Sequence, residues 1–173
     1  MGGEILEKLI IGKNDFETWC KENNREDLLE EWNYGKNNGL KPSEIFKSGS
    51  GKKYWWKGKC GHEWDAVISS RITIRQGKTR MLKPSGCPYC SNPPKRVLVG
   101  FNDLETWCKE NQRETLLIEW DYEKNKKGPK DIGFSTHEKY YFKCIKDNNH
   151  SELKAISKIT RLDRDKTDLY NHF

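Results

Sequence analysis

The stretch Cys60-Gly61-His62 and, 25 residues after the histidine, the stretch beginning at Cys87-Pro88-Tyr89-Cys90 decide the fold of this chain. Each stretch is short enough to place its side chains on one tight turn. Together they offer three thiolates and one imidazole, a donor set that tetrahedral zinc takes in proteins. A Cys-x-x-Cys turn can direct both sulfurs at one ion while backbone N–H groups soften the thiolate charge. The pattern therefore predicts one structural Zn²⁺ ion held by Cys60, His62, Cys87 and Cys90.

This site is predicted to be closed. Four protein ligands leave no open coordination position, which is typical of a structural rather than a catalytic zinc site. The alternative interpretation is a redox Cys-x-x-Cys motif with an unrelated Cys60, but such a motif needs a βαβ context that this sequence does not show. Cys20 and Cys108 lie on apolar helical faces and are interpreted as packing residues.

The composition favours small domains with thin cores. The chain has 173 residues, of which 34% are hydrophobic, and its mean hydropathy is -1.01. Modules below about 80 residues seldom bury enough apolar surface to be stable without a metal or a disulfide. The first residues lack the pattern of a signal peptide, and no membrane span is evident. We therefore expect a cytoplasmic, reducing location without a membrane partner, where clustered cysteines bind metal.

The chain repeats itself at an offset of 88 residues. Residues 12–37 align with residues 100–125, and 19 of these 26 positions are identical. Asn14 and Glu17 have the spacing of a helix capping box, and apolar residues follow at helical intervals, so a pair of short helices is expected in each repeat. The apolar helical residues are Phe16, Trp19, Cys20, Leu28, Leu29 and Trp32, matched by Leu104, Trp107, Cys108, Leu116, Leu117 and Trp120.

A β-hairpin beside a metal knuckle is expected after each helical pair. The aromatic runs 54–57 and 140–143 are typical of strands, and short extended segments are also expected at 9–11 and 97–99. The second repeat has Cys144 and His150, but a cysteine pair at the spacing of the first would fall at residue 175, beyond Phe173. We expect this repeat to lack a complete zinc site and to be held by packing of Trp107, Trp120, Tyr141 and Phe142. Whether Cys144 and His150 bind metal is left open.

These motifs resemble a known family, the probable zinc-ribbon, treble-clef-like repeat domains of unknown function found in bacterial, phage and plant proteins. The residues that carry the resemblance are Asn102 to Trp107, Glu31-Trp32, Lys36-Asn37, Tyr54-Trp55-Trp56, Cys60-Gly61-His62-Glu63-Trp64, Arg71 and Gly86-Cys87-Pro88 with Cys90. The resemblance implies an α+β fold of two tandem modules, residues 1–92 with a complete zinc site and residues 93–173 as a degenerate or truncated repeat.

The resemblance also implies the same four zinc ligands and an association with nucleic acid, because similar modules accompany nuclease-like or DNA-processing domains. Two departures limit this transfer. A basic insertion occupies residues 73–85, and His150-Ser151-Glu152 replaces the His-x-Trp pattern in the second repeat.

The charge distribution favours a polyanionic partner. Residues 51–100 hold eleven Lys or Arg and only two acidic residues, whereas the rest of the chain is net acidic and the whole carries +6. A solvated lysine-rich face would give the same composition. The leading interpretation is a non-enzymatic, zinc-stabilised module that binds nucleic acid, DNA in preference to RNA. Its candidate phosphate contacts are Lys57, Lys59, Arg71, Arg75, Lys78, Arg80 and Lys83. A base would stack on whichever of Tyr54, Trp55 and Trp56 faces solvent, although at least two of them are expected in the core.

Two other function classes are considered. The acidic helical segments 26–31 and 105–119 would repel nucleic acid and fit a protein-interaction module, for example a phage or mobile-element protein that inhibits or recruits a CRISPR or restriction effector. A nuclease is disfavoured because His62 is committed to zinc, and neither a His-Asn-His pattern nor a carboxylate pair stands at catalytic spacing. No small-molecule substrate is expected.

Overall fold

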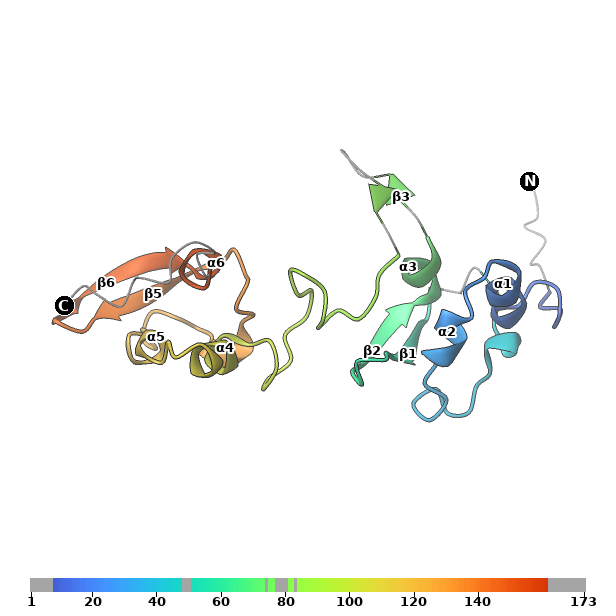
Figure 1. Ribbon diagram of the computed structural model, residues 1–173, viewed down its shortest axis with the longest axis horizontal. Helices are drawn as coiled ribbons and strands as arrows, with labels where there is room; N and C mark the ends of the chain where they lie inside the picture. Colours follow the sequence, from blue (N-terminus) through green and yellow to red (C-terminus); the bar gives the residue numbers. More distant parts are fainter. Residues whose placement is uncertain (1–7, 48–50, 74, 77–80, 83, 162–173) are drawn as a thin grey trace, which may run out of the picture. The chain divides into compact units, whose positions relative to one another are not determined.

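The chain divides into two compact units, residues 1–90 and residues 91–173, within two residues of the expected boundary after residue 92. The computed structural model describes residues 8–47, 51–73, 75–76, 81–82 and 84–161 (Figure 1). Both units mix short helices with antiparallel hairpins, as the expected α+β class requires. No described helix is long and apolar enough to span a membrane.

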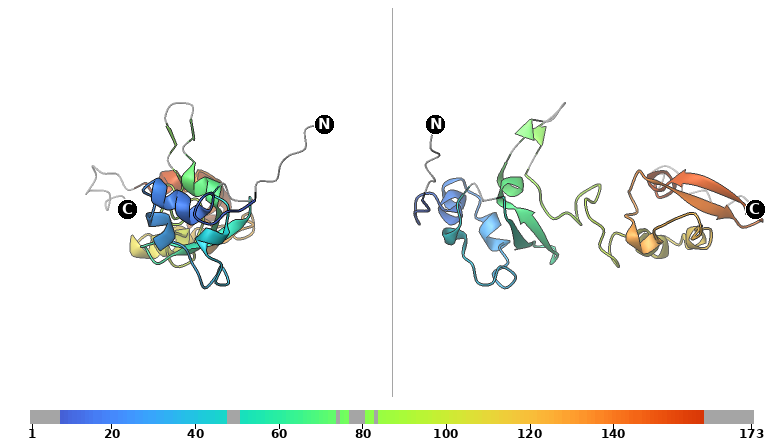
Figure 2. Two further views of the ribbon diagram at one scale, coloured as in Figure 1. Left: turned by 90° about the vertical axis from the view of Figure 1, so that its right-hand side faces the viewer. Right: turned by 180° about the vertical axis from the view of Figure 1, so that it is seen from behind.

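The first unit places two short helices beside a hairpin. Its elements are α1 (Phe16–Glu22), α2 (Asp27–Glu30), the 3-10 helix η1 (Pro42–Glu44), β1 (Lys53–Lys57), β2 (Glu63–Val67), α3 (Ile68–Ile72), β3 (Arg75–Gln76) and β4 (Met81–Leu82). Strands β1 and β2 pair in register from Lys53 opposite Val67 to Lys57 opposite Glu63. The short β3–β4 pair projects away from this hairpin (Figures 1 and 2).

The second unit has the same order of elements up to its last helix. They are α4 (Leu104–Glu110), α5 (Thr115–Ile118), η2 (Pro129–Asp131), β5 (Lys139–Cys144), β6 (Asp147–Ala155) and α6 (Ile156–Ile159). Strands β5 and β6 pair from Lys139 opposite Ala155 to Lys143 opposite Ser151, after which the register shifts and Cys144 lies opposite Asp147.

The first helix begins one residue later than the capping-box spacing predicts. Asp15, not Asn14, is the N-cap, and its carboxylate accepts hydrogen bonds from the N–H of Thr18 at 2.8 Å, the hydroxyl of Thr18 at 2.8 Å and the N–H of Gly12 at 2.6 Å. The Asn14 amide instead accepts from the N–H of Ile10 at 2.7 Å and fastens the preceding turn. Residues 9–11 are not part of a strand, and residue 11 begins the turn before α1, so the expected strand segment is not formed.

The same arrangement recurs in the second unit. Asp103 is the N-cap of α4 and accepts from Thr106 and Gly100, while Asn102 accepts from the N–H of Leu98. Residues 97–99 are likewise not part of a strand, and residue 99 begins the turn before α4.

Alternation along the first strand of each hairpin separates a buried aromatic face from an exposed one. In β1, Tyr54 and Trp56 are buried and Trp55 is 36% exposed, so two of the three aromatic residues belong to the core. Trp56 packs edge-on against Trp32, with ring centroids 5.3 Å apart. In β5 the corresponding outward residue, Tyr141, is 37% exposed, and the expectation that it packs in the core is wrong.

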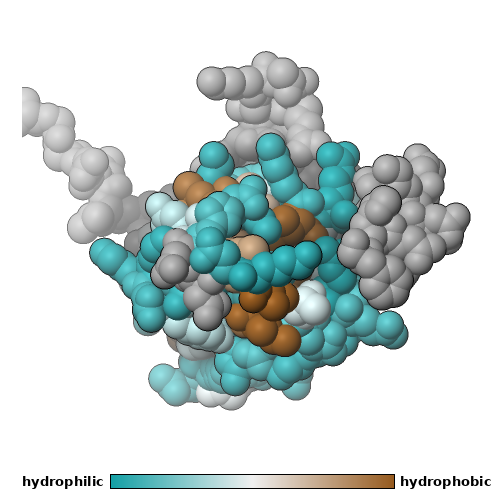
Figure 3. All heavy atoms as spheres, turned by 90° about the vertical axis from the view of Figure 1, so that its left-hand side faces the viewer, coloured by the Kyte–Doolittle hydropathy of each residue, from teal (hydrophilic) through white to brown (hydrophobic). Residues whose placement is uncertain are grey.

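The described surface of the second unit includes exposed apolar side chains. Ile118 at the end of α5 is 73% exposed, and Ile145 after β5 is 63% exposed. Figure 3 shows a face on which hydrophobic side chains gather in the middle and hydrophilic ones surround them. In the first unit the residues at these two positions are polar. Glu30 corresponds to Ile118 and Lys59 to Ile145, and the two form an ion pair at 3.2 Å.

The Asp15 cap should contribute measurably to stability. Asp15 is fully buried, and its replacement by alanine should lower the free energy of unfolding of the first unit by about 1–2 kcal/mol at pH 7. Urea unfolding followed by tryptophan fluorescence measures this change. Lys13→Ala, at an exposed position of the same turn, should change stability by less than about 0.5 kcal/mol.

The contribution of Asp15 should also depend on pH. Burial raises the pKa of its carboxyl, but the hydrogen bonds from Thr18 and Gly12 outweigh burial and hold the pKa below the usual 3.8. A carboxyl with a lowered folded-state pKa stabilises the fold above its unfolded pKa and loses this contribution as pH falls through the folded value. The difference between wild type and Asp15→Ala should therefore shrink below about pH 4. An unchanged difference at pH 3 would contradict this account.

Candidate metal centre

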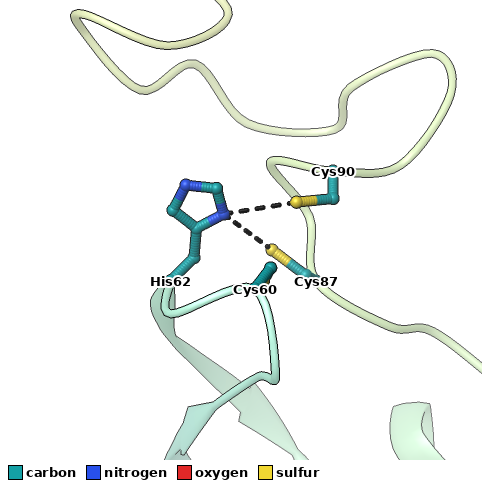
Figure 4. Close-up of side chains that lie close together, drawn as sticks. All are labelled: Cys60, His62, Cys87 and Cys90. Carbon is teal, nitrogen blue, oxygen red and sulfur yellow. Dashed lines mark hydrogen bonds between the residues drawn. The ribbon is translucent and has the colours of Figure 1, made fainter.

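Four side chains of the first unit converge on one point, as the sequence predicts. Cys60 and His62 lie in the turn between β1 and β2, and Cys87 and Cys90 lie in the segment after β4 (Figure 4). Their ligand atoms all lie within 4.8 Å of one another. His62 Nδ1 is 3.3 Å from the sulfur of Cys90 and 3.7 Å from that of Cys87.

The first pair of ligands is set by a tight turn that glycines allow. Gly61 has φ of +81°, in the left-handed region that glycine adopts without strain. The N–H of Gly58 donates to the carbonyl of His62 at 3.0 Å and closes the turn. A Cβ atom at Gly58 would lie 3.1 Å from both the Cys60 sulfur and the Trp64 ring, so position 58 has little room for a side chain.

The second pair of ligands is held against α3. The Ser85 N–H and hydroxyl both donate to the carbonyl of Ser70, at 2.9 Å each, and the Arg71 guanidinium donates to the carbonyl of Ser85. Within the Cys-x-x-Cys turn, the Tyr89 ring meets the His62 ring edge-on at 5.6 Å. Sequence reasoning did not identify Ser85 or Tyr89, because single hydrogen bonds and ring contacts between residues distant in the chain leave no periodic signal.

The pKa values of two thiols in the cluster, Cys60 and Cys90, are shifted in opposite directions. Burial raises the pKa of the Cys60 thiol, but hydrogen bonds from the His62 backbone and from the thiols of Cys90 and Cys87 outweigh burial and lower it. Burial, together with hydrogen bonds and the charge repulsion of its two cysteine neighbours, raises the pKa of Cys90 to about 12. The Cys60 thiol therefore ionises before the Cys90 thiol, whereas metal coordination requires deprotonated sulfurs. A divalent cation would supply the charge that holds several thiolates together.

The donor set fits a structural metal ion. Three sulfurs and one imidazole nitrogen match the tetrahedral Cys₃His arrangement and leave no position for a substrate or a reactive water. In the part of the chain that the structure describes, no other group of three or more His, Cys, Asp or Glu side chains converges in this way. When bound, the ion would supply a cross-link between the β1–β2 turn and the segment after β4.

Within its described residues, the second unit has no such cluster of three or more ligands. His150 directly precedes Ser151, the register equivalent of Glu63, and so matches His62. Cys144 directly follows Lys143, the equivalent of Lys57, so it occupies the position of Gly58 and not that of Cys60. By register, Cys144 is therefore not the counterpart of the ligand Cys60.

Arg71 is a structural residue and not a phosphate contact. Its side chain is 3% exposed and forms an ion pair with Glu31. Its guanidinium carbon lies 4.9 Å from the centroid of the Trp56 ring and 5.3 Å from that of Trp64. A buried guanidinium that is already paired cannot reach a polyanion, so the sequence-based assignment of Arg71 to nucleic-acid binding is wrong.

The other basic candidates divide into two groups. Lys57 and Lys59 are exposed beside the metal centre, and Lys59 pairs with Glu30. Arg75 lies in β3, but its side chain, like Lys78, Arg80 and Lys83, falls outside the residues that the structure describes.

Removing one ligand should abolish metal binding and loosen only the first unit. Cys87→Ser removes a thiolate, so the binding of about one metal ion per chain should be lost, because affinity depends on the complete donor set. Metal analysis and Co²⁺ absorption spectra measure binding, and hydrogen exchange should show lost protection in β1 and β2 but not in β5. Cys144→Ser, outside the cluster, is the matched control. Full metal occupancy in Cys87→Ser would contradict the assignment.

Replacing Arg71 by alanine should destabilise the first unit by about 3 kcal/mol, because it removes the partner of Glu31 and empties the space between two tryptophan rings. Removing one partner of a buried ion pair costs about 3–5 kcal/mol. We expect the lower end of this range, because the Glu31 side chain is 21% exposed and can be hydrated when Arg71 is absent. Urea unfolding measures the loss, with Lys21→Ala at an exposed ion pair as the control. Stability within 0.5 kcal/mol of wild type would show that Arg71 is not part of the core.

The candidate metal centre lies within a segment that matches a known family. No curated protein matches the chain. Residues 28–93 match the model of a family described as a probable treble clef zinc finger domain, and this segment runs from α2 past the fourth ligand, Cys90. The first unit thus carries a probable treble clef zinc finger domain.

Proposed function

We propose that this protein is a non-enzymatic, zinc-stabilised module that binds nucleic acid. The observation that carries the proposal is the charge around the metal centre. Residues 51–100 hold eleven basic and two acidic residues, and the four ligands lie inside this segment. Phosphate groups supply most of the affinity in sequence-independent nucleic-acid binding, and clustered Lys and Arg are their usual partners.

The closed donor set supports a structural role for the ion. Zn²⁺ is the metal that best suits three thiolates and one imidazole, and four protein ligands leave no site for an activated water. Lys57 and Lys59 lie beside the Cys60 turn, so a metal that fixes this turn also fixes two exposed ammonium groups. The sequence places further basic residues between 75 and 83, which add to the positive charge of this segment.

The second unit fits a degenerate copy of the same module. It has the helical pair, the 3-10 turn, the hairpin and the final short helix in the same order as the first unit. It lacks the second cysteine pair within the described residues, and Glu152 stands where Trp64 packs in the first unit. We therefore propose two tandem treble-clef-like modules, of which only the first binds zinc.

Binding to nucleic acid should fall steeply with salt. Fluorescence anisotropy with labelled 20-nucleotide DNA and RNA, single-stranded and duplex, measures the affinity between 50 and 200 mM NaCl. Each phosphate contact contributes about 0.7–0.9 to the slope of log K against log [salt]. Lys57→Ala and Lys59→Ala should each weaken binding and lower the slope by up to about 1.

Lys21→Ala is the control, because this exposed lysine lies on α1 and pairs with Glu17. Its affinity and salt slope should match those of wild type. Absent or salt-independent binding to every probe would contradict the proposed function and favour the alternative of a protein-interaction module.

A further inference from the structure

The outer faces of the two hairpins repeat one pattern that the core does not require. In β1, Lys53, Trp55 and Lys57 point outward, and in β5 the corresponding positions are Lys139, Tyr141 and Lys143. Side chains two residues apart on a strand share a face, so each unit presents an aromatic ring between two lysines. An exposed position imposes no demand for an aromatic side chain, yet both units have one.

Each of these aromatic residues is braced by an asparagine. The Asn37 side chain donates to the carbonyl of Trp55 at 2.9 Å and accepts from its N–H at 2.9 Å. Asn125 makes the same two bonds to Tyr141, at 2.8 and 2.9 Å. These hydrogen bonds satisfy the backbone N–H and C=O groups on the outer edge of the strand, and they hold the strand at the aromatic residue while leaving its ring exposed.

A third lysine lies near each ring. The residue before each asparagine is a lysine, and its ammonium group is 4.3 Å from the Trp55 centroid for Lys36 and 5.4 Å from the Tyr141 centroid for Lys124. A lysine side chain is long and flexible, and an exposed cation–π contact is weaker than the stacking of a base on an aromatic ring. An incoming base can therefore displace the ammonium group, which remains beside it to pair with phosphate.

The two faces differ in their acidic residues. In the first unit the partner strand places Glu63 opposite Lys57 and Asp65 opposite Trp55. These carboxylates hold Lys36 at 2.7 Å and Lys53 at 2.9 Å. A polyanion would have to compete with both ion pairs.

In the second unit the partner strand is neutral at these positions. Ser151 lies opposite Lys143, and Leu153, which is 45% exposed, lies opposite Tyr141. Lys143 pairs with Glu123 at 3.3 Å and lies 3.9 Å from Asp121. Among the residues that the structure describes, Lys124 and Lys139 form no ion pair with a carboxylate.

We propose that the outer face of the β5–β6 hairpin binds single-stranded nucleic acid, with a base stacked on Tyr141 beside Leu153 and phosphates paired to Lys124, Lys139 and Lys143. The inference rests on the proposed function and names its substrate class. A single strand is favoured because its bases expose their π-faces, which a duplex buries. The Trp55 face of the first unit is a weaker site of the same kind, because its two carboxylates neutralise its lysines.

The direct test removes the ring. Fluorescence anisotropy with labelled dT20 and with a 20-base-pair duplex at 50 mM NaCl compares wild type, Tyr141→Ala and Tyr141→Trp. Tyr141→Ala should weaken dT20 binding at least about fivefold and leave duplex binding within about twofold. Tyr141→Trp, which installs the residue of the first unit, should restore dT20 binding. The control is Phe101→Ala, because Phe101 is an aromatic residue of the same unit, 45% exposed, in the turn before α4.

The charge argument has its own test in a swap between units. Ser151→Glu with Leu153→Asp installs the two carboxylates of the first unit and should weaken dT20 binding at least as much as Tyr141→Ala. Glu63→Ser with Asp65→Leu, the reverse swap, should strengthen it. Circular dichroism and thermal unfolding verify that each variant folds.

Three outcomes are distinguishable. If wild type binds nucleic acid but Tyr141→Ala and the swap leave dT20 binding unchanged, this inference fails and the proposed function stands. If wild type binds neither probe, both fail. If the Tyr141 face instead retains a protein after nuclease treatment, and Tyr141→Ala releases it, the face is a protein-interaction surface and the inference is overturned.

Discussion

In each unit, the chain that leaves the second short helix pairs for one residue with the first strand of the hairpin. In the first unit this bridge joins Trp32 to Trp56. The Lys57 N–H donates to the carbonyl of Glu31 at 2.7 Å, and the Asn33 N–H donates to the carbonyl of Trp55 at 3.1 Å. Helices of four to seven residues and isolated two-stranded hairpins are both marginal in water. The bridge joins them, and it brings the two indole rings that fill the core into edge-on contact.

The two units diverge beside this bridge, where the first has a metal centre. There the buried residues Trp64 and Arg71 contact each other, Arg71 pairs with the half-buried Glu31, and a bound ion would add its coordination energy to a thin core. By register and by the repeat offset, the second unit has Glu152 and Ile159 in place of Trp64 and Arg71. Ile159 packs against the second core.

Other contacts support the second unit where the first uses metal. The Thr160 hydroxyl donates to the carbonyl of Phe134 at 2.6 Å, which ties the end of α6 to the loop after η2. The Phe134 ring stacks on Trp107 at 6.3 Å. A hydrophobic replacement for a buried ion pair is often neutral or stabilising, so Ile159 at the position of Arg71 is compatible with a stable second core.

Sequence patterns that are periodic or local predicted the structure well. The helical pairs and the aromatic strands were visible from spacing alone, because each depends on residues that lie close together in the chain. The four ligands were visible because each of their two pairs is a short motif and the two pairs together complete one donor set. The errors arose where the outcome depends on contacts distant in sequence or on register. Asn14 and Asp15 are both acceptable N-caps by residue type, and only the geometry of the preceding turn distinguishes them. Arg71 has the composition of a nucleic-acid contact, and only the position of Glu31, 40 residues earlier, shows that it is buried.

Cys144 illustrates the same limit. Identity of residue type aligned it with Cys60, whereas hydrogen-bond register aligns it with Gly58. The segment between Lys143 and Ser151, which includes the paired residues Cys144 and Asp147, has seven residues, against five between Lys57 and Glu63. With these two added residues, Cys144 is the last residue of β5, whereas Cys60 lies in the turn after β1.

A hairpin that is covered on one face uses only half of its residues for the core. The residues of these strands therefore fall into two sets, one that packs in the core and one that faces outward. Tyr54, Trp56, Tyr140 and Phe142 are buried, so packing limits what these positions accept. The intervening lysines and aromatic rings are under no such limit. These outward residues are nevertheless of the same types in both units, although the units differ in metal ligands, in the length of the hairpin connection and in the opposite strand. Packing explains why the core residues match, but it does not explain why the outward residues match. It points to a constraint that acts on the surface itself, where a ligand can meet it.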